Sequence, residues 1–181
     1  MTRLVILILT CLAVTGCATE LVLDSDDALA VIPRRISDTG HIVVETRLNG
    51  LGPFRFVIDT GASISVIYEH TRAKIGIEPL PNIKAHVFGI GGSDLFPLAQ
   101  VAEIRVGDER WQDARVAVLP DASPIAARID GILGVDFLSQ YAVLHSQQEQ
   151  ALLLYPRELV SDSFYAGWDS VTLRELRVGD G

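Results

Sequence analysis

The chain has 181 residues, and its 15 lysines and arginines against 23 aspartates and glutamates give a formal net charge of −8 at pH 7. Nucleic-acid binding is not expected, because it depends on basic groups that neutralise phosphates and no basic run is longer than Arg34-Arg35. The length is enough for one domain with a hydrophobic core, and no internal repeat or low-complexity segment divides it.

The first 16 residues have the features of a secretory signal peptide. Arg3 supplies the positive charge, and the apolar stretch over residues 4–14 is too short to span a bilayer. Residues 14–17 match a bacterial lipobox, in which the cysteine, here Cys17, is lipidated and becomes the first mature residue. We therefore expect a lipoprotein on the periplasmic face of the bacterial envelope, and Ala18 after the cysteine favours the outer membrane. The alternative is a plain secretory signal or an uncleaved anchor.

Cysteine and metal chemistry are not expected in the mature domain. Cys11 leaves with the signal peptide and Cys17 carries lipid, so neither a disulfide nor a catalytic thiol remains. The histidines are scattered without the spacing of metal ligands or a neighbouring acidic cluster, which predicts no metal site; they are His41, His70, His86 and His145. We expect no other cofactor.

After a tether over residues 17–27, residues 28–155 read as one domain of short strands. In chain order the apolar and polar alternation predicts strands at 42–48, 54–58 and 63–67, a helix at 68–75, strands at 83–88, 95–99, 102–106 and 114–119, a helix at 135–140, and strands at 142–145 and 151–155. This density of strands predicts an all-β fold with a closed, barrel-like sheet and one or two short helices. The tail, residues 156–181, is either part of a subunit interface or a loosely attached extension.

The strongest candidate for catalysis is Asp59, at the end of a predicted strand. The apolar residues 56–58 run directly into it, and an ionised carboxylate in apolar surroundings loses hydration unless other contacts compensate. The strand alternation places Asp59 on the face of Arg55 and Val57, which directs it toward a cleft. The loop that follows consists of Thr60, Gly61, Ala62 and Ser63. The hydroxyl of Thr60 can orient the loop, Gly61 allows a close approach of the backbone, and Ser63 offers a further local hydrogen bond.

A second Asp-Thr-Gly sequence serves as an internal control. Asp38 opens this copy, which follows Arg34-Arg35 instead of an apolar run and precedes an alternating segment that starts at His41. The pattern predicts an ordinary hairpin turn.

The segment around Asp59 resembles the active-site signature of aspartic proteases, most closely that of the retropepsin-like group. Two later segments agree with this resemblance in order and spacing, over about residues 42–155. Residues 88–92 resemble the tip of the flap hairpin that closes over substrate, with Gly89, Ile90, Gly91 and Gly92. Residues 130–138 resemble the apolar-apolar-glycine motif that packs beside the catalytic loop and leads into a short helix, here Ile132, Leu133 and Gly134.

This chain departs from the retroviral members at two positions. Those enzymes commonly carry a second aspartate where Ser63 stands, and an arginine where Val135 stands. Their buried charge pair is therefore absent, and their substrate-backbone contacts and dimer electrostatics do not carry over.

The resemblance implies an aspartic endopeptidase that hydrolyses periplasmic or envelope proteins. The chemistry needs two adjacent carboxylates that share a proton, and the chain has one credible catalytic aspartate. We therefore expect a homodimer in which Asp59 of each subunit forms half of the dyad. The alternative is a peptide-binding or scaffold lipoprotein that keeps the protease fold without catalysis.

Overall fold

The computed structural model describes residues 25–89, 92–122 and 126–159. The predicted signal peptide and lipidation site, most of the predicted tether, the flap-tip candidates Ile90 and Gly91, and the tail from residue 160 onward lie outside the described residues. Within the described part of the chain, no helix has the length and apolar character needed to cross a membrane.

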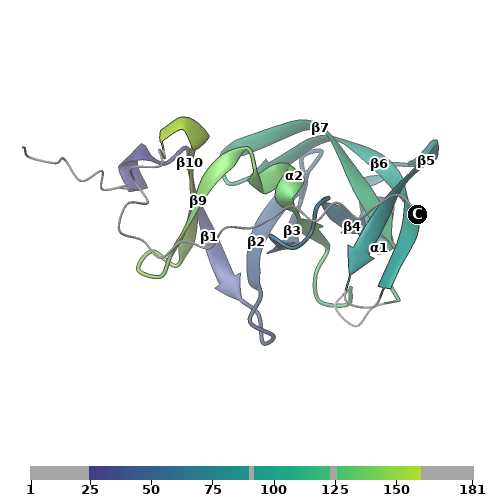
Figure 1. The fold of residues 1–181 in the computed structure, drawn as a ribbon, viewed down its shortest axis with the longest axis horizontal. Helices are drawn as coiled ribbons and strands as arrows, with labels where there is room; N and C mark the ends of the chain where they lie inside the picture. Colours follow the sequence, from purple (N-terminus) through teal and green to yellow (C-terminus); the bar gives the residue numbers. More distant parts are fainter. Residues whose placement is uncertain (1–24, 90–91, 123–125, 160–181) are drawn as a thin grey trace, which may run out of the picture.

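Ten strands and two α-helices make up the domain (Figure 1). The strands are β1 (Ala30–Ile36), β2 (Ile42–Leu48), β3 (Leu51–Ile58), β4 (Val66–Tyr68), β5 (Pro79–Gly89), β6 (Gly92–Val106), β7 (Glu109–Leu119), β8 (Gly131–Leu133), β9 (Tyr141–Ser146) and β10 (Ala151–Pro156). The α-helices are α1 (Glu69–Ile75) and α2 (Val135–Leu138), and the 3-10 turns η1 (Ser25–Asp27) and η2 (Arg157–Leu159) flank the domain.

Six of the strands close into a barrel, as the all-β prediction requires. Their order is β6-β7-β4-β8-β3-β2, and a pairing of β2 with β6, which sets Arg47 opposite Arg105, completes the circle. Outside the barrel, β1 pairs with both β2 and β10, and β9 pairs with β10, so that these strands continue the sheet to one side (Figure 1).

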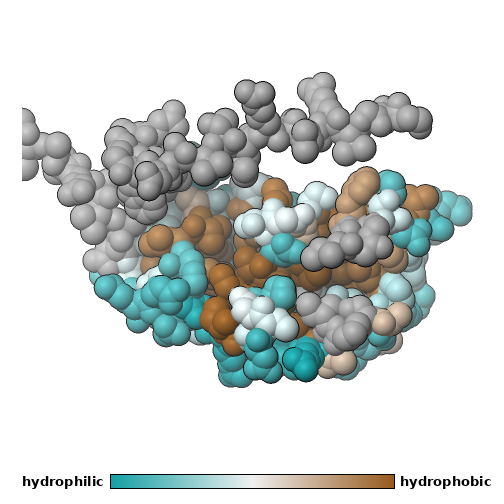
Figure 2. Space-filling model, turned by 60° about the horizontal axis from the view of Figure 1, so that its bottom comes forward, coloured by the Kyte–Doolittle hydropathy of each residue, from teal (hydrophilic) through white to brown (hydrophobic). Residues whose placement is uncertain are grey.

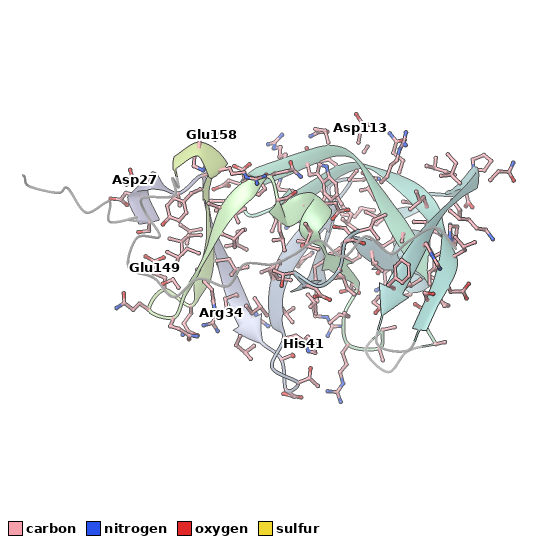
Figure 3. All side chains as sticks on the ribbon, in the orientation of Figure 1. Asp27, Arg34, His41, Asp113, Glu149 and Glu158 are labelled. Carbon is pink, nitrogen blue, oxygen red and sulfur yellow. The ribbon has the colours of Figure 1, made fainter. Side chains whose placement is uncertain are left out.

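The barrel interior is filled by one side of each strand, because successive residues of a strand point to opposite faces. On β2 the buried residues alternate with exposed Glu45 and Arg47, and polar side chains such as His41 and Asp113 lie at the periphery (Figure 3). The largest fully buried side chains of this main core are Phe56, Phe137, Leu48, Ile67, Ile104, Leu133, Leu152 and Leu154.

Most predicted elements are confirmed, but β1 and β8 are strands that the sequence did not predict, and several other elements differ in their bounds. The strand expected at 63–67 lies later, at Val66–Tyr68, because the residues before it form the catalytic loop. The segments 95–99 and 102–106 belong to one strand, since β6 extends over 15 residues from the flap to the barrel closure. The helix α1 ends as expected at Gly76, whose left-handed conformation (φ +68°) lets its N–H bond the carbonyl of Arg72.

The Asp38 copy of Asp-Thr-Gly is a hairpin turn, as predicted. It joins β1 to β2, and the N–H of Ser37 donates to the carbonyl oxygen of His41 at 2.9 Å. The turn contains its own polar contacts, including one between the Thr39 hydroxyl and Nδ1 of His41 at 2.7 Å.

Candidate active site

Asp59 is placed by the pairing of β3 with β8. These two strands run parallel, with Ile58 opposite Leu133, and the N–H of Asp59 donates to the carbonyl oxygen of Leu133 at 3.0 Å. The structure therefore brings the candidate aspartate and the motif of Ile132, Leu133 and Gly134 together from positions more than 70 residues apart in the sequence.

The loop after β3 folds around the carboxyl group of Asp59. Gly61 donates its N–H to Oδ1 at 2.8 Å, and Ala62 donates to the Asp59 carbonyl at 3.3 Å. The other side-chain oxygen has no hydrogen-bond partner among the described residues, and the side chain is half-buried. One oxygen is thus held in place while the other remains available to water or substrate.

Two glycines of the β8 motif let the chain segments approach closely enough to form this site. A Cβ on Gly134 would lie 2.6 Å from the carbonyl oxygen of Ala62, and one on Gly131 would lie 2.5 Å from that of Val66. No side chain fits at such distances. Val135 then donates its N–H to the Ala62 carbonyl at 2.8 Å, which fixes the catalytic loop against the start of α2.

A buried serine and a carboxylate hold these two segments together. Ser65 is fully buried; its N–H donates to Oδ2 of Asp136 at 2.8 Å and its hydroxyl donates to Oδ1 at 2.6 Å. The Ser65 oxygen in turn accepts the N–H of Gly134 at 3.0 Å. Neither residue was among the candidates that the sequence indicated. The signal available was their position: Ser65 follows Ser63 by two residues, and Asp136 follows Gly134 by two.

Ser63, from which a local hydrogen bond was expected, lies at the surface of the loop. Its side chain is exposed and forms no hydrogen bond to any described residue, because Ser65 takes that role from the inward-facing position. Thr60 is exposed as well and also lacks a partner within the described residues of this single chain. Its position at the surface leaves it accessible to a second subunit.

A histidine bridges two carboxylates behind the site. Nδ1 of His70 lies 2.7 Å from Asp121, and Nε2 lies 3.2 Å from Asp130, whose other oxygen accepts the N–H of Arg55 at 2.7 Å. Burial alone would raise the pKa of Asp121, but the hydrogen bonds from His70 outweigh it and hold this pKa below its usual value. The cluster connects α1 to the residue that precedes β8, and nothing in the spacing of these residues predicted it.

The flap is a hairpin of β5 and β6, and Gly89 pairs with Gly92 at its end. Phe88 and Leu95 are more than half exposed on this hairpin. Phe96 of this hairpin and Ile132 of the β8 motif both pack against one buried apolar cluster, made up of Val66, Leu98 and Ala117. Apolar residues also form a band across the face that carries the β1–β2 turn (Figure 2). An apolar surface beside a half-buried carboxyl group is suited to bind a peptide.

No three His, Cys, Asp or Glu side chains gather in a metal-binding arrangement within the parts of the chain that the structure describes.

Comparisons with known proteins agree with this geometry. The family model described as aspartyl protease matches residues 44–137, just over half of the chain. A retropepsin-like aspartic protease from Rickettsia conorii superposes with a TM-score of 0.50 at 17% identity, over 69% of this chain and 89% of that one. The retroviral protease-like domain of Ddi1 from Leishmania major gives a TM-score of 0.40 at 13% identity, over 67% and 96%. No curated protein sequence matches significantly. The family match and the shared fold, which positions Asp59, lead to one conclusion: the chain belongs to the aspartyl protease family and has the retropepsin-like fold.

Proposed function

We propose that the protein is an aspartic endopeptidase that works as a homodimer, with Asp59 of each subunit contributing one carboxyl group to a shared site. The observation that carries the proposal is the position of Asp59, whose carboxyl group is held on one side by Gly61 and open on the other. The buried Ser65–Asp136 contact supports the proposal, because it fixes the catalytic loop against β8 and α2.

A second copy of the chain supplies the second carboxyl group. Hydrolysis of a peptide bond by aspartates requires two, and the Asp38 copy cannot provide one because it lies in the β1–β2 turn, outside the loop that β8 supports. An isologous dimer places the same residue from both subunits at the two-fold axis. The exposed Thr60 side chains are then free to interact across that axis.

The two Asp59 groups share one proton and divide the chemistry between them. The ionised group takes a proton from a water molecule as the water oxygen attacks the peptide carbonyl carbon, and the protonated group gives its proton to the carbonyl oxygen. When the tetrahedral intermediate breaks its C–N bond, the amine nitrogen receives the proton that the first Asp59 took from water and leaves, while a hydroxyl of the intermediate returns its proton to the second Asp59. The rate then has a bell-shaped pH dependence that belongs to the pair, and we expect its optimum on the acidic side of neutral.

The substrate binds in an extended conformation beneath the flap hairpin. An extended peptide can add backbone hydrogen bonds to exposed strand edges, while alternate side chains enter apolar pockets. The partly buried side chains of Phe96 and Ile132, which pack against one apolar cluster, fit this role.

Lipidation at Cys17 would confine the subunits to one membrane surface. The segment between Cys17 and η1, residues 18–24, reaches at most about 25 Å when fully extended, so both barrels would stay close to the bilayer. Confinement raises the effective concentration of subunits. We propose that envelope proteins are the substrates, and that a soluble form without Cys17 loses specific activity on dilution. Constant specific activity of the soluble form across a wide dilution series would contradict this part.

The function is tested with a diverse peptide pool incubated with the purified domain between pH 4 and 7. The expected result is a set of cleavage products that disappears in Asp59→Asn and persists in Asp38→Asn, the matched substitution in the second Asp-Thr-Gly. Identical peptide profiles with and without the wild-type protein would instead favour a scaffold that keeps the fold without catalysis.

A further inference from the structure

Arginines gather along one face of this acidic protein, in two adjoining hollows beside the catalytic strand. One hollow, of about 500 Å³, lies over the outer faces of β1, β2 and β3, and the other, of about 660 Å³, lies between the β1–β2 turn and β3. They share Arg35, Val43 and Arg55 and so form one continuous depression. We call it the arginine groove; the charged residues that line it are Arg34, Arg35, Arg47, Arg55, Arg105, Arg128, Asp38 and Glu45.

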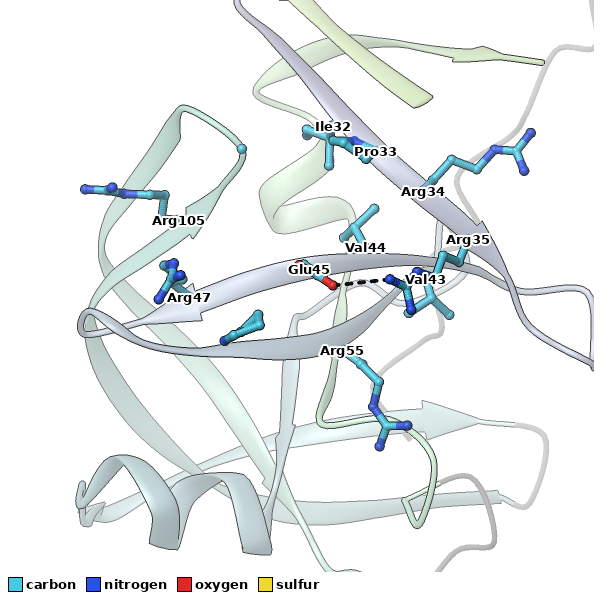
Figure 4. Close-up of a pocket in the computed structure, with 12 residues that line it drawn as sticks. Ile32, Pro33, Arg34, Arg35, Val43, Val44, Glu45, Arg47, Arg55 and Arg105 are labelled. Carbon is cyan, nitrogen blue, oxygen red and sulfur yellow. Dashed lines mark ion pairs between the residues drawn. The ribbon is translucent and has the colours of Figure 1, made fainter. Parts of the chain in front are cut away.

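Not every one of these arginines faces the groove. Figure 4 shows Arg34 and Arg105 directed away from its middle, whereas Arg35 reaches toward Glu45 and Arg55 extends from β3 on the side opposite β2. Even if Arg34 and Arg105 are left out, four arginines oppose the two acids that line the groove, and one of the four, Arg55, also pairs with Asp130 outside it, with Nε 3.6 Å from Oδ2. The groove is therefore cationic on a chain whose net charge is −8.

The acids of the groove hold its arginines only weakly. The closest N–O distance is 3.8 Å between Arg35 and Glu45 and 3.7 Å between Arg128 and Asp38, and all four side chains are more than 60% exposed. Exposed pairs at such distances contribute little to stability. Arg47 has no ion-pair partner among the described residues. These guanidinium groups can turn to a carboxylate of a ligand at little cost.

The register of the barrel strands places like charges side by side at one end of the groove. Arg47 of β2 lies directly opposite Arg105 of β6, and Arg105 lies directly opposite Arg110 of β7. Among the described residues, Glu103 is the only acidic residue that forms an ion pair with Arg105 or Arg110, and the N–O distance is 3.7 Å in both pairs. Like charges on directly opposed strand positions destabilise a sheet.

The floor of the groove is apolar and leads to the active site. Val43 and Ile36 line the hollow beside the β1–β2 turn, and so does Val57 of β3, which precedes Asp59 by two residues. An apolar floor with arginines on both sides fits an extended polypeptide whose side chains alternate between apolar and acidic. It does not fit a single small anion, which would need convergent donors at one point.

We infer that the arginine groove binds an acidic, extended segment of the substrate polypeptide next to the segment that is cleaved. This inference rests on the proposed peptidase function and specifies its substrate class: proteins in which a cleavable apolar stretch adjoins glutamates or aspartates. Carboxylates on the substrate form bidentate contacts with Arg47, Arg55 or Arg128, and these contacts add affinity without entering the chemistry.

The test uses one cleavable core peptide, taken from the peptide-pool assay. Five residues of glutamate, glutamine or lysine are added to it, at its N-terminal end in one series and at its C-terminal end in another. The glutamate form should be cleaved with a kcat/KM at least about fivefold above the glutamine form, mainly through KM, because several exposed ion pairs add up. The lysine form should be the poorest substrate. High salt should remove the difference, since it screens exposed charges.

Charge reversal locates the effect. The double variant Arg47→Glu with Arg128→Glu should lose the preference for the glutamate form, whereas Arg115→Glu, an equally exposed arginine on β7 outside the groove, should retain it. Equal cleavage of the glutamate and glutamine forms by the wild type would overturn the inference. An equal loss in Arg115→Glu would also overturn it, because the effect would then come from overall charge.

Binding to the Asp59→Asn variant separates this inference from the function. Fluorescence anisotropy should show tighter binding of the glutamate peptide than the glutamine peptide, with dependence on Arg47 and Arg128. If this result appears while the wild type cleaves nothing, the peptidase proposal fails and the groove remains a site for acidic polypeptide. If the variant binds anionic lipid vesicles in an Arg47-dependent way and does not discriminate between the peptides, the groove is a membrane surface and the inference is wrong.

Discussion

Ser65 and Asp136 form a two-point contact that joins the catalytic loop to α2: the N–H and the hydroxyl of Ser65 donate to the two oxygens of the Asp136 carboxylate at 2.8 and 2.6 Å. The two residues are 71 positions apart in the sequence, and the Ser65 hydroxyl oxygen also accepts the N–H of Gly134. The Asp59 loop is held against α2 by this contact and by the bond from the Val135 N–H to the Ala62 carbonyl, and no other side-chain hydrogen bond among the described residues joins the two segments.

Replacement of Ser65 by alanine should therefore reduce both stability and activity. The change removes a fully buried hydroxyl and leaves the Gly134 N–H without its acceptor and Oδ1 of Asp136 with only the Phe137 N–H, at a cost of about 2–3 kcal/mol. Urea unfolding followed by circular dichroism measures this loss. Ser63→Ala is the control, and it should change stability by no more than about 0.5 kcal/mol because Ser63 is exposed. Similar stabilities for the two variants would show that the contact does not support the loop.

Gly134→Ala should disrupt the loop that carries Asp59 more than Gly61→Ala, whose Cβ would meet only Oδ1 of Asp59, at 3.1 Å. The Cβ of Gly134→Ala would meet the carbonyl oxygen of Ala62 at 2.6 Å and that of Ile64 at 3.0 Å, so the loop or β8 must move, at a cost of about 2–3 kcal/mol or more. Thermal unfolding and peptidase assays should both show the loss. Gly40→Ala, in the β1–β2 turn, meets no atom within 4 Å and should cost only about 1–2 kcal/mol for its left-handed backbone.

The Tyr141–Glu109 contact predicts a loss of stability at high pH. Burial and then the hydrogen bond to Glu109, at 3.0 Å, raise the pKa of Tyr141 to about 12. A tyrosine in the unfolded chain ionises near pH 10, so the stabilisation is complete below about pH 10 and is lost as the pH rises toward 12. Unfolding free energies of the wild type should fall over this interval more steeply than those of Tyr141→Phe. Parallel curves for the two proteins would contradict the assignment.

The His70 bridge predicts the opposite dependence at low pH. Hydrogen bonds from His70 hold the pKa of Asp121 below its usual value despite burial, so this carboxylate stabilises the fold above about pH 4 and loses that effect as the pH falls through its folded pKa. His70→Asn should flatten the acid limb of the stability profile. His86→Asn, on the exposed surface of the flap, is the matched control and should leave the acid limb unchanged.

The strands and the catalytic loop could be predicted from the sequence, whereas the contacts that hold them could not. Alternation along 42–48 and 54–58 predicts a hairpin because one face of each strand enters the core, and the apolar approach to Asp59 distinguishes it from the Asp38 turn. The Ser65–Asp136 contact depends on the parallel pairing of β3 with β8, which no local pattern encodes. The His70 cluster and the arginine groove likewise join residues that only the closed barrel brings together.

The claim that Asp59 is half of a site shared by two chains is tested most directly by mixing subunits. Wild-type protein and Asp59→Asn are combined in varying ratios at constant total concentration, allowed to exchange, and assayed on one peptide. Because only dimers with two intact aspartates act, an equal mixture should keep about a quarter of the wild-type activity, and activity should follow the square of the wild-type fraction. A linear dependence, with about half of the activity in the equal mixture, would show that each chain acts alone and would contradict the account.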